Sequence, residues 1–322
     1  MKLGFYPSML AVWLAICTIF VSQTYGQFSA DYQTNTISGI ASNWVGEYFV
    51  GSNSVFNTLI IQSAGLLSNA DGIIGYEDGS TNNVAIVSDP GSVWSNRANL
   101  YVSYGGSGNS LVISNGASTY SSFGYIGAYG ESNTGIVCGP QSVWDNNNIL
   151  YVGYQGSFNQ LIITNGGVVN AGASYVGFDL ATNNTVIVSG TGSVWNTQSE
   201  LNVGRYGFQS KLVIADGAAV YDTTGNVGIT VFSHSNAVVV SGSGSVWSNR
   251  DLLRVGACGC CGGGCGDGTL VITNGGAVVS STFSLTSGMV TLAGGTLTVN
   301  QLLANSGVVF LRAAPFIPWA RP

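Results

Sequence analysis

Carboxylate side chains are the first candidates for chemistry in this chain of 322 residues. Glu77, Asp78, Glu131 and Asp179 stand in Gly-, Ser- and Asn-rich segments that we expect to be loops. Two carboxylates that face each other could serve as the acid and base of a polysaccharide-cleaving enzyme. No third polar group accompanies them, however, and turns collect Asp because its side chain bonds to nearby backbone. We therefore predict no catalytic residue, with a polysaccharide-cleaving enzyme as the alternative.

A histidine-based triad or metal centre would have to use His234, because it is the only histidine. It stands between Ser233 and Ser235 in an expected turn, where a solvated imidazole needs no special role. We expect neither a metal site nor any other cofactor.

Four cysteines gather in one glycine-rich segment, at Cys258, Cys260, Cys261 and Cys265. Their spacing matches no usual zinc pattern, and clustered cysteines of exported proteins generally pair with one another. We predict disulfides among these four and leave binding of a soft metal as the alternative. Cys138 stands alone in an expected strand.

Aromatic side chains recur at a fixed interval and are the best candidates for recognition. They are Tyr101, Tyr125, Tyr151, Tyr175, Tyr104 and Tyr154. The first four share one outward position on successive units, and the last two lie at the mouth of the loop that follows. Such a stripe suits the flat faces of sugars or the surface of another protein. The alternative is a ladder of rings that only stabilises the sheet.

A repeat of about 25 residues must position these side chains. Tryptophans recur at intervals of 50, 50, 51 and 52 residues, from Trp44 to Trp247. The pattern Asn-x-apolar-x-apolar recurs about twice as often. Its first residues are Asn57, Asn83, Asn109, Asn133, Asn159, Asn184 and Asn236, with Ser210 and Gly268 in the same position of two further units. The residue 11 positions after each marker is a tryptophan in every second unit, so we expect these residues to form one structural column.

Each unit contains three short apolar runs separated by Asn-Gly, Gly-Gly or Ser-Gly turn signals. Units that repeat in one direction cannot form hairpins. We therefore predict an all-β fold: a single right-handed, three-sided parallel β-helix, or β-solenoid, of about ten coils. The alternation of apolar and polar residues places five side chains in the interior of the solenoid: Leu100, Val102, Leu111, Ile113 and Val93. The tryptophans form a second candidate binding column. The marker asparagines should stack along one edge.

Composition supports a folded repeat protein and argues against nucleic-acid binding. Hydrophobic residues make up 45% of the chain, and charged residues make up 7%, which disordered chains do not show. Only eight residues are Lys or Arg, and the formal net charge is -6. The chain lacks the basic stripe that would attract a nucleic acid.

The N-terminal segment resembles a cleavable signal peptide. Lys2 precedes an apolar run of 13 residues from Met9 to Val21, which is shorter than the roughly 20 residues of a membrane span. We expect a signal peptide at 1–26 and an N-terminal cap at 27–44. The solenoid repeats should occupy 45–306, and a C-terminal tail 307–322.

Three segments resemble a bacterial repeat shared by autotransporter (type V secretion) passengers and PEP-CTERM sorted envelope proteins. They are Gly192–Trp195 (GSVW), Leu150–Ser157 (LYVGYQGS) and Leu161–Gly167 (LIITNGG). The resemblance covers about residues 40 to 300. It implies a non-enzymatic adhesin, stalk or envelope component, secreted or held on the bacterial cell surface.

The resemblance stops before the C-terminus. The tail from Val308 to Pro322 matches neither the translocator barrel of autotransporters nor a PEP-CTERM sorting signal. The expected partners are glycans or cell-surface proteins, with self-association as a further expectation. The alternatives are a polysaccharide-binding or polysaccharide-cleaving solenoid, and an end-to-end filament subunit.

Overall fold

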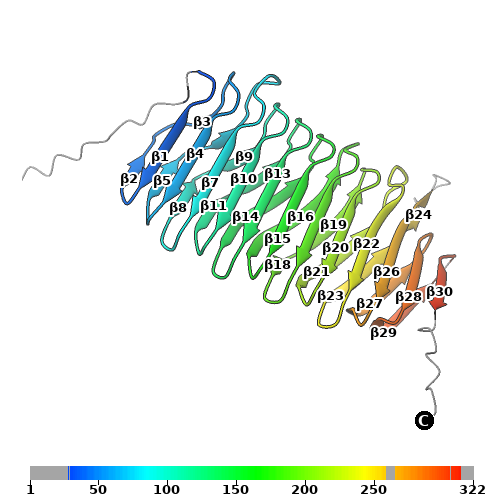
Figure 1. Cartoon of the computed structure of the whole chain (residues 1–322). Coiled ribbons are helices and arrows are strands. Elements are labelled where there is room, and N and C mark those ends of the chain that lie inside the picture. Colours follow the sequence, from blue (N-terminus) through cyan, green and yellow to red (C-terminus); the bar gives the residue numbers. More distant parts are fainter. Residues whose placement is uncertain (1–27, 29, 259–264, 305, 313–322) are drawn as a thin grey trace, which may run out of the picture.

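The computed structural model describes residue 28 and residues 30–258, 265–304 and 306–312. The expected signal peptide lies outside the described residues, as do Cys260 and Cys261. The described chain forms a parallel β-solenoid of strands and turns with no helix, so the predicted fold class is confirmed (Figure 1). In the part of the chain that is described, no helix is long and apolar enough to cross a membrane.

One side of the solenoid is a sheet of 12 parallel strands, which we call sheet A. The nine strands from β4 to β26 each begin at or directly after a marker position, and neighbouring strands pair through equivalent residues, such as Leu111 with Gly135. Its strands are β1 (Thr34–Ser38), β4 (Thr58–Gln62), β7 (Val84–Ser88), β10 (Ser110–Ser114), β13 (Thr134–Cys138), β15 (Gln160–Thr164), β17 (Thr185–Ser189), β20 (Lys211–Ala215), β22 (Asn236–Ser241), β26 (Gly268–Thr273), β28 (Met289–Ala293) and β30 (Val308–Arg312).

The other two sides form a sheet of 16 strands, sheet B. Its strands are β2 (Ala41–Asn43), β3 (Tyr48–Val50), β5 (Leu66–Asn69), β6 (Gly72–Ile74), β8 (Val93–Asn96), β9 (Asn99–Val102), β11 (Ser118–Ser121), β12 (Phe123–Ile126), β14 (Val143–Val152), β16 (Val168–Phe178), β18 (Val194–Thr197), β19 (Glu200–Arg205), β21 (Ala219–Val227), β23 (Val246–Val255), β27 (Ala277–Leu285) and β29 (Thr296–Ala304). In turns such as that of β14, one long strand bends through both sides, with a register shift between Asn146 and Ile149.

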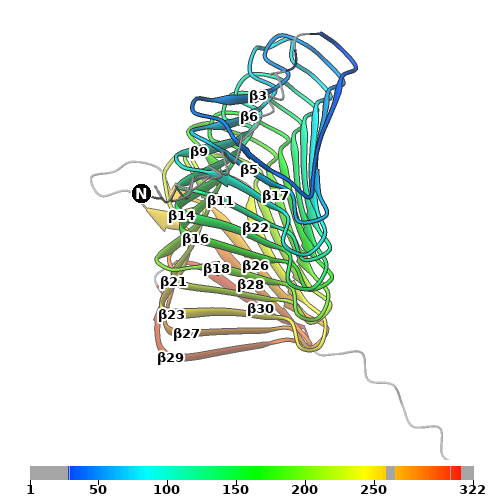
Figure 2. The same ribbon diagram turned by 90° about the vertical axis from the view of Figure 1, so that its left-hand side faces the viewer.

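The repeated turns share one interior (Figure 2). There are about nine turns, and further strands extend both sheets at the two ends. β1 and β2 lie in the segment expected to be an N-terminal cap, and they pair in parallel with β4 and β5. That part of the segment therefore has the same strand pairing as the repeats.

The interior is a continuous apolar core to which every turn contributes. Leu100, Val102, Leu111 and Ile113 are fully buried, as predicted. Val93 was expected inside, and this expectation is wrong: it lies half-buried on the outer face, because its neighbour Trp94 occupies the inner position. Burying the larger indole removes more apolar surface from water than burying a valine.

The tryptophans are therefore no binding column. Trp94, Trp144, Trp195 and Trp247 have no exposed surface. Trp94 lies in register with Leu67 and Thr119, and its Nε1 donates a hydrogen bond of 2.7 Å to Asn69 Oδ1. The indoles thus serve as core side chains, each separated from the next by a smaller one.

The expected column 11 residues after each marker is also wrong. Thr119, not Tyr120, pairs with Trp94 and Trp144, and Tyr120 points outward. The turn from sheet A to sheet B is one residue longer in the tryptophan units, because Ser88 pairs with Ser114 while Val93 pairs with Ser118. A constant sequence spacing therefore mixes inward and outward positions.

The asparagine ladder is confirmed. Asn109 N donates to Asn133 Oδ1 at 2.9 Å, and Asn133 N donates to Asn159 Oδ1 at 2.9 Å. The side-chain Nδ2 of Asn133 bonds to Asn159 Oδ1 and to the carbonyl of Gly106 in the loop of the preceding turn. These amides satisfy buried backbone groups where the loop returns to sheet A, which explains why the marker is asparagine.

Candidate functional site

Four tyrosines form one stack along the second strand segment of sheet B. The ring centroids of Tyr101, Tyr125, Tyr151 and Tyr175 are separated in turn by 4.7, 5.2 and 5.2 Å. The rings are nearly parallel, with interplanar angles of 12°, 14° and 17°. Equivalent residues of parallel strands lie one strand spacing apart, so their side chains must stack at about 4.8 Å.

A second row of rings comes from the loop that follows these strands. Tyr104 meets Tyr101 edge to face at 5.5 Å, and Tyr154 meets Tyr151 in the same way at 5.1 Å. Phe178 repeats the contact on Tyr175 at 5.2 Å. Edge-to-face and offset-stacked pairs are the favourable geometries for aromatic rings, so the two rows hold each other in place.

The structure adds one residue that the sequence pattern missed, Tyr129. Its ring lies between the loop rings Tyr104 and Tyr154, at 5.1 and 6.4 Å. The loop after β12 carries Ala128 in the position of Tyr154, so its tyrosine comes one residue later. A search for aromatics anywhere in this loop, instead of at one fixed position, would have found it.

Between the two rows lies an open groove of about 290 Å³. Its lining residues are Tyr101, Tyr104, Tyr125, Ala128, Tyr129, Tyr151 and Tyr154. Tyr129 is 50% exposed and Tyr104 is 36% exposed, whereas the stacked rings of Tyr101, Tyr125 and Tyr151 are half-buried. The loop row therefore carries most of the surface that a ligand could reach.

The hydroxyls of Tyr101, Tyr125 and Tyr151 stay protonated at the floor of the groove. Burial raises the pKa of Tyr125 to about 12, and the neighbouring Tyr151 adds a smaller upward effect. Burial also raises the pKa of Tyr101 and of Tyr151 above the usual value. At physiological pH these three residues thus offer neutral hydroxyls, which can donate and accept hydrogen bonds.

An ion pair lies against Tyr175, the last ring of the stack. Tyr175 OH donates to Glu200 Oε1 at 2.6 Å, and Arg205 Nη1 lies 3.0 Å from the same oxygen. The guanidinium also stands over the Tyr175 ring, 5.6 Å from its centroid. Tyr175 is consequently only 8% exposed, and Asn202 takes its outward position on the next strand. The accessible part of the stripe is Tyr101 to Tyr154.

Two of the residues considered for catalysis, Asp179 and His234, contact other polar side chains outside the sheets. Asp179 accepts a hydrogen bond from Gln155 at 2.5 Å, and both are loop side chains. His234 Nδ1 lies 3.9 Å from Asp267 Oδ1, and Ser233 bonds instead to Thr230. Among the described residues, no three His, Cys, Asp or Glu side chains gather as a metal site would require.

The cysteine segment forms a small antiparallel hairpin of β24 (Ala257–Cys258) and β25 (Cys265–Gly266). Cys258 lies opposite Cys265 in this pairing, and Cys265 is disulfide-bonded. Cys138 is a free thiol, half-buried in β13.

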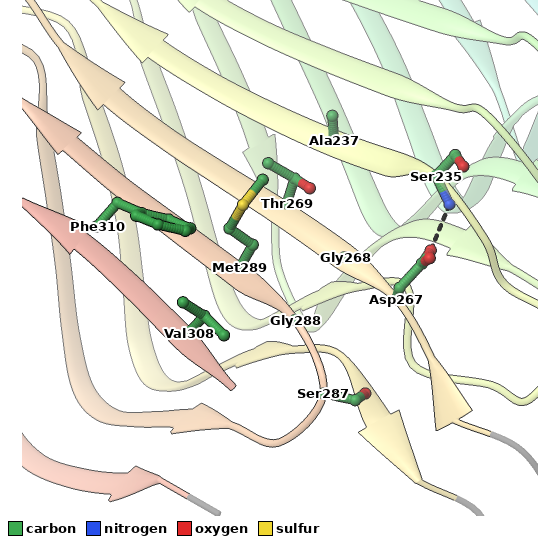
Figure 3. Close-up of a pocket in the computed structure, with 10 residues that line it drawn as sticks. All are labelled: Ser235, Ala237, Asp267, Gly268, Thr269, Ser287, Gly288, Met289, Val308 and Phe310. Carbon is green, nitrogen blue, oxygen red and sulfur yellow. Dashed lines mark hydrogen bonds between the residues drawn. The ribbon is translucent and has the colours of Figure 1, made fainter. Parts of the chain in front are cut away.

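A second groove, of about 620 Å³, lies at the C-terminal end of sheet A (Figure 3). Met289, Val308 and Phe310 line it from neighbouring strands, and the backbone of Ser235 donates a hydrogen bond to Asp267 at its rim. Its walls are mainly apolar and carry no cluster of catalytic groups.

No protein-family model matches the chain, and no curated protein is significantly similar to it in sequence. Among solved structures, it is similar to the crystal structure of a TibA fragment that TibC had hyper-glycosylated. The two share 15% sequence identity with a TM-score of 0.42, over 87% of this chain and 98% of that chain. The likeness is distant.

Proposed function

We propose that this chain is an exported, non-enzymatic surface protein whose solenoid presents the tyrosine groove to extended glycans. The signal-like N-terminus and the resemblance to repeats of bacterial surface proteins support export. The regular pairing of parallel strands makes the solenoid a stiff support for side chains on its outer faces.

The groove itself is the observation that carries the proposal. Its rings come from consecutive turns, so the groove runs along the solenoid axis as an open channel. An extended chain of sugars could lie in it and stack successive rings on Tyr104, Tyr129 and Tyr154. Each stacking contact contributes about 1 kcal/mol, and the affinity would come from several such contacts acting together.

The test is binding of the exported chain to a glycan array, with Tyr129→Ala as the variant. Tyr129 is half-exposed and lies outside the sheet, so its loss removes contact surface without opening the core. We expect binding to weaken about tenfold, as loss of one or two stacking contacts predicts. Tyr221→Ala is the matched control, because Tyr221 is 45% exposed on the outer face of sheet B away from the groove.

Tyr151→Ala is a less specific test of the same site. Its ring is packed between Tyr125 and Tyr175 and against Tyr154, so the variant loses stability as well as affinity. Equal glycan binding by Tyr129→Ala and the unaltered chain would reject the groove as the binding site. The two rows of rings would then only stabilise the loops.

A further inference from the structure

The outer face of sheet A carries an unbroken apolar stripe. The central outward residue of nine consecutive strands is isoleucine or valine. These residues are Ile60, Ile86, Val112, Ile136, Ile162, Ile187, Val213, Val239 and Val271. All nine are half-buried by their neighbours, and each lies in register with the next. The strip they form therefore runs across nine of the twelve strands of sheet A.

Two rows of outward residues border the stripe, and just over half of those that the structure describes are serine or threonine. On one side stand residues such as Ser110, Thr134 and Thr185, and on the other Ser114 and Thr164. Of the outward side chains that the structure describes on β1 to β30 of sheet A, only Lys211 is charged. Water-exposed faces usually mix charges of both signs, so this face is unusual in a chain of net charge -6.

Sheet B shows the contrast. The nearest equivalent column on its outer face includes Val143 and Val168 but is interrupted by Ser118 and Ala219. Asp145 stands beside this column, and the exposed ion pair of Arg250 and Asp251 follows on β23. The uncharged, continuous stripe is thus a property of sheet A, not of every face of the solenoid.

The groove of Figure 3 belongs to the same face. Ala237, Thr269, Met289 and Val308 follow one another in register along one border of the stripe, and Phe310 continues its central column beyond Thr291. Val308 and Phe310 are about half-exposed. The apolar surface therefore widens toward the C-terminal end of the sheet.

We infer that the outer face of sheet A is the interface between two copies of this chain, packed face to face about a two-fold axis. A two-fold interface brings the same patch of both copies together, so the patch must be self-complementary. An apolar stripe flanked by hydroxyl rows meets this condition, because apolar groups pack on apolar groups and hydroxyls both donate and accept. Lys211 is the one charged outward side chain described on the strands of this face, and Asp267 lies at its rim, so a second copy meets little like-charge repulsion.

The size of the face also suits a dimer. Twelve strands at about 4.8 Å and five residues at about 3.3 Å give a footprint of roughly 900 Å² per copy. Stable protein interfaces bury about 800 Å² on each partner. The tyrosine groove lies on sheet B and its loops, so face-to-face packing of sheet A leaves it open on both copies.

Sedimentation velocity of the exported chain tests the inference, with Ile162→Lys as the variant. Ile162 lies near the middle of the stripe, and both copies of the dimer carry its replacement. We expect a dimer for the unaltered chain and a rise of about 100-fold or more in its dissociation constant for the variant, because buried like charges are costly. Val168→Lys is the matched control, as an outward, half-buried valine of sheet B, and should remain dimeric.

Cys138 provides a second readout that does not depend on mass. Its free thiol belongs to the hydroxyl border of the same face, so a partner should slow its reaction with a maleimide. We expect faster labelling in Ile162→Lys than in Val168→Lys, with unchanged far-ultraviolet circular dichroism in both. A monomeric unaltered chain, an assembly larger than a dimer, or a dimer unaffected by Ile162→Lys would each overturn the inference. None of these outcomes changes the glycan test, which concerns the opposite sheet.

Discussion

At the scale of single residues, the most unusual group is the buried carboxyl of Asp222. Its Oδ2 accepts a hydrogen bond of 2.7 Å from Trp247 Nε1, while Oδ1 has no partner among the described residues. Asn249, in register on the next strand, also has an amide without partners there. Burial raises the pKa of Asp222 to about 8, although the bond from Trp247 acts in the opposite direction. The interior thus favours the protonated acid.

We predict that Asp222→Asn stabilises the protein at pH 8 and flattens its pH dependence. A folded-state pKa above the ordinary value of 3.8 means that the folded chain binds this proton more tightly than the unfolded chain. Its stabilising effect is complete below pH 4 and is lost between about pH 4 and pH 8, at up to about 1.4 kcal/mol per pH unit. Asparagine keeps the acceptor for Trp247 and removes the charge.

Thermal unfolding followed at several pH values measures the effect. Asp145→Asn removes a carboxylate from the outer face of sheet B and controls for the change in net charge. A melting temperature of Asp222→Asn that falls between pH 4 and pH 8 as steeply as that of the unaltered chain would contradict the prediction.

At the scale of elements, the asparagine ladder joins each turn to its neighbours. Asn133 takes part in three buried hydrogen bonds through its side chain, with partners in the turns before and after. Ser210 fills the equivalent position after β19, and its own backbone N–H donates to Asn236 Oδ1. The shorter serine side chain bonds within its own turn, to the carbonyl of Phe208.

Asn133→Ala should lower the free energy of unfolding by about 3 kcal/mol or more. The variant leaves the N–H of Asn109 buried without an acceptor, at a cost of about 1–3 kcal/mol, and it loses two further buried bonds at about 1 kcal/mol each. The carbonyl of Gly106 keeps its bond from Ser103. Urea unfolding measures the loss. Asn147→Ala serves as the comparison, because Asn147 is exposed on β14 and should change stability by less than about 0.5 kcal/mol.

The hairpin of β24 and β25 yields a prediction about covalent structure. Cys265 is disulfide-bonded, whereas Cys138 is free. We expect mass spectrometry of the exported chain to show alkylation of Cys138 without reductant and of Cys265 only after reduction. Labelling of Cys265 in the unreduced protein would restore the alternative of a metal-binding thiol cluster.

Sequence periodicity predicted the strands, the ladder and the tyrosine stack, because each depends only on equivalent residues meeting between turns. It failed where a turn changes length. The extra residue before each tryptophan reversed the expected faces of Val93 and Trp94. In the loop after β12, Tyr129 comes one residue later than the pattern expects. The contact of Arg205 with Tyr175 joins two turns that differ in composition, so the periodicity does not predict it.

At the scale of the whole molecule, the two ends of the solenoid differ. At the N-terminal end Phe28 is buried against the core, and Trp44 packs on Tyr48. At the C-terminal end Leu302 is 58% exposed, and Leu311 is 77% exposed. Since each turn of a solenoid is stabilised by its neighbours, an end whose apolar side chains remain exposed is the weaker one.

We predict that hydrogen exchange is fastest in β28 to β30 and slows toward the middle turns. Strands such as β15 and β17 are paired on both edges and fully buried on their inner faces, so they open only when much of the solenoid unfolds. Exchange followed by mass spectrometry resolves this gradient. Protection of β30 equal to that of β15 would show that the C-terminal end is covered in solution.

The direction of the asparagine ladder has a consequence for how the chain acquires its structure. Six of the nine marker N–H groups are satisfied by an amide oxygen that comes about 25 residues later in the chain, as Asn109 is by Asn133. A turn therefore stays incomplete until its successor has formed. A polypeptide can emerge N-terminus first from a ribosome or an export channel. We then expect its turns to fold one at a time, each when the next turn has emerged. The hydrogen bonds of the ladder therefore form in order, from the N-terminal turns toward the C-terminal turns.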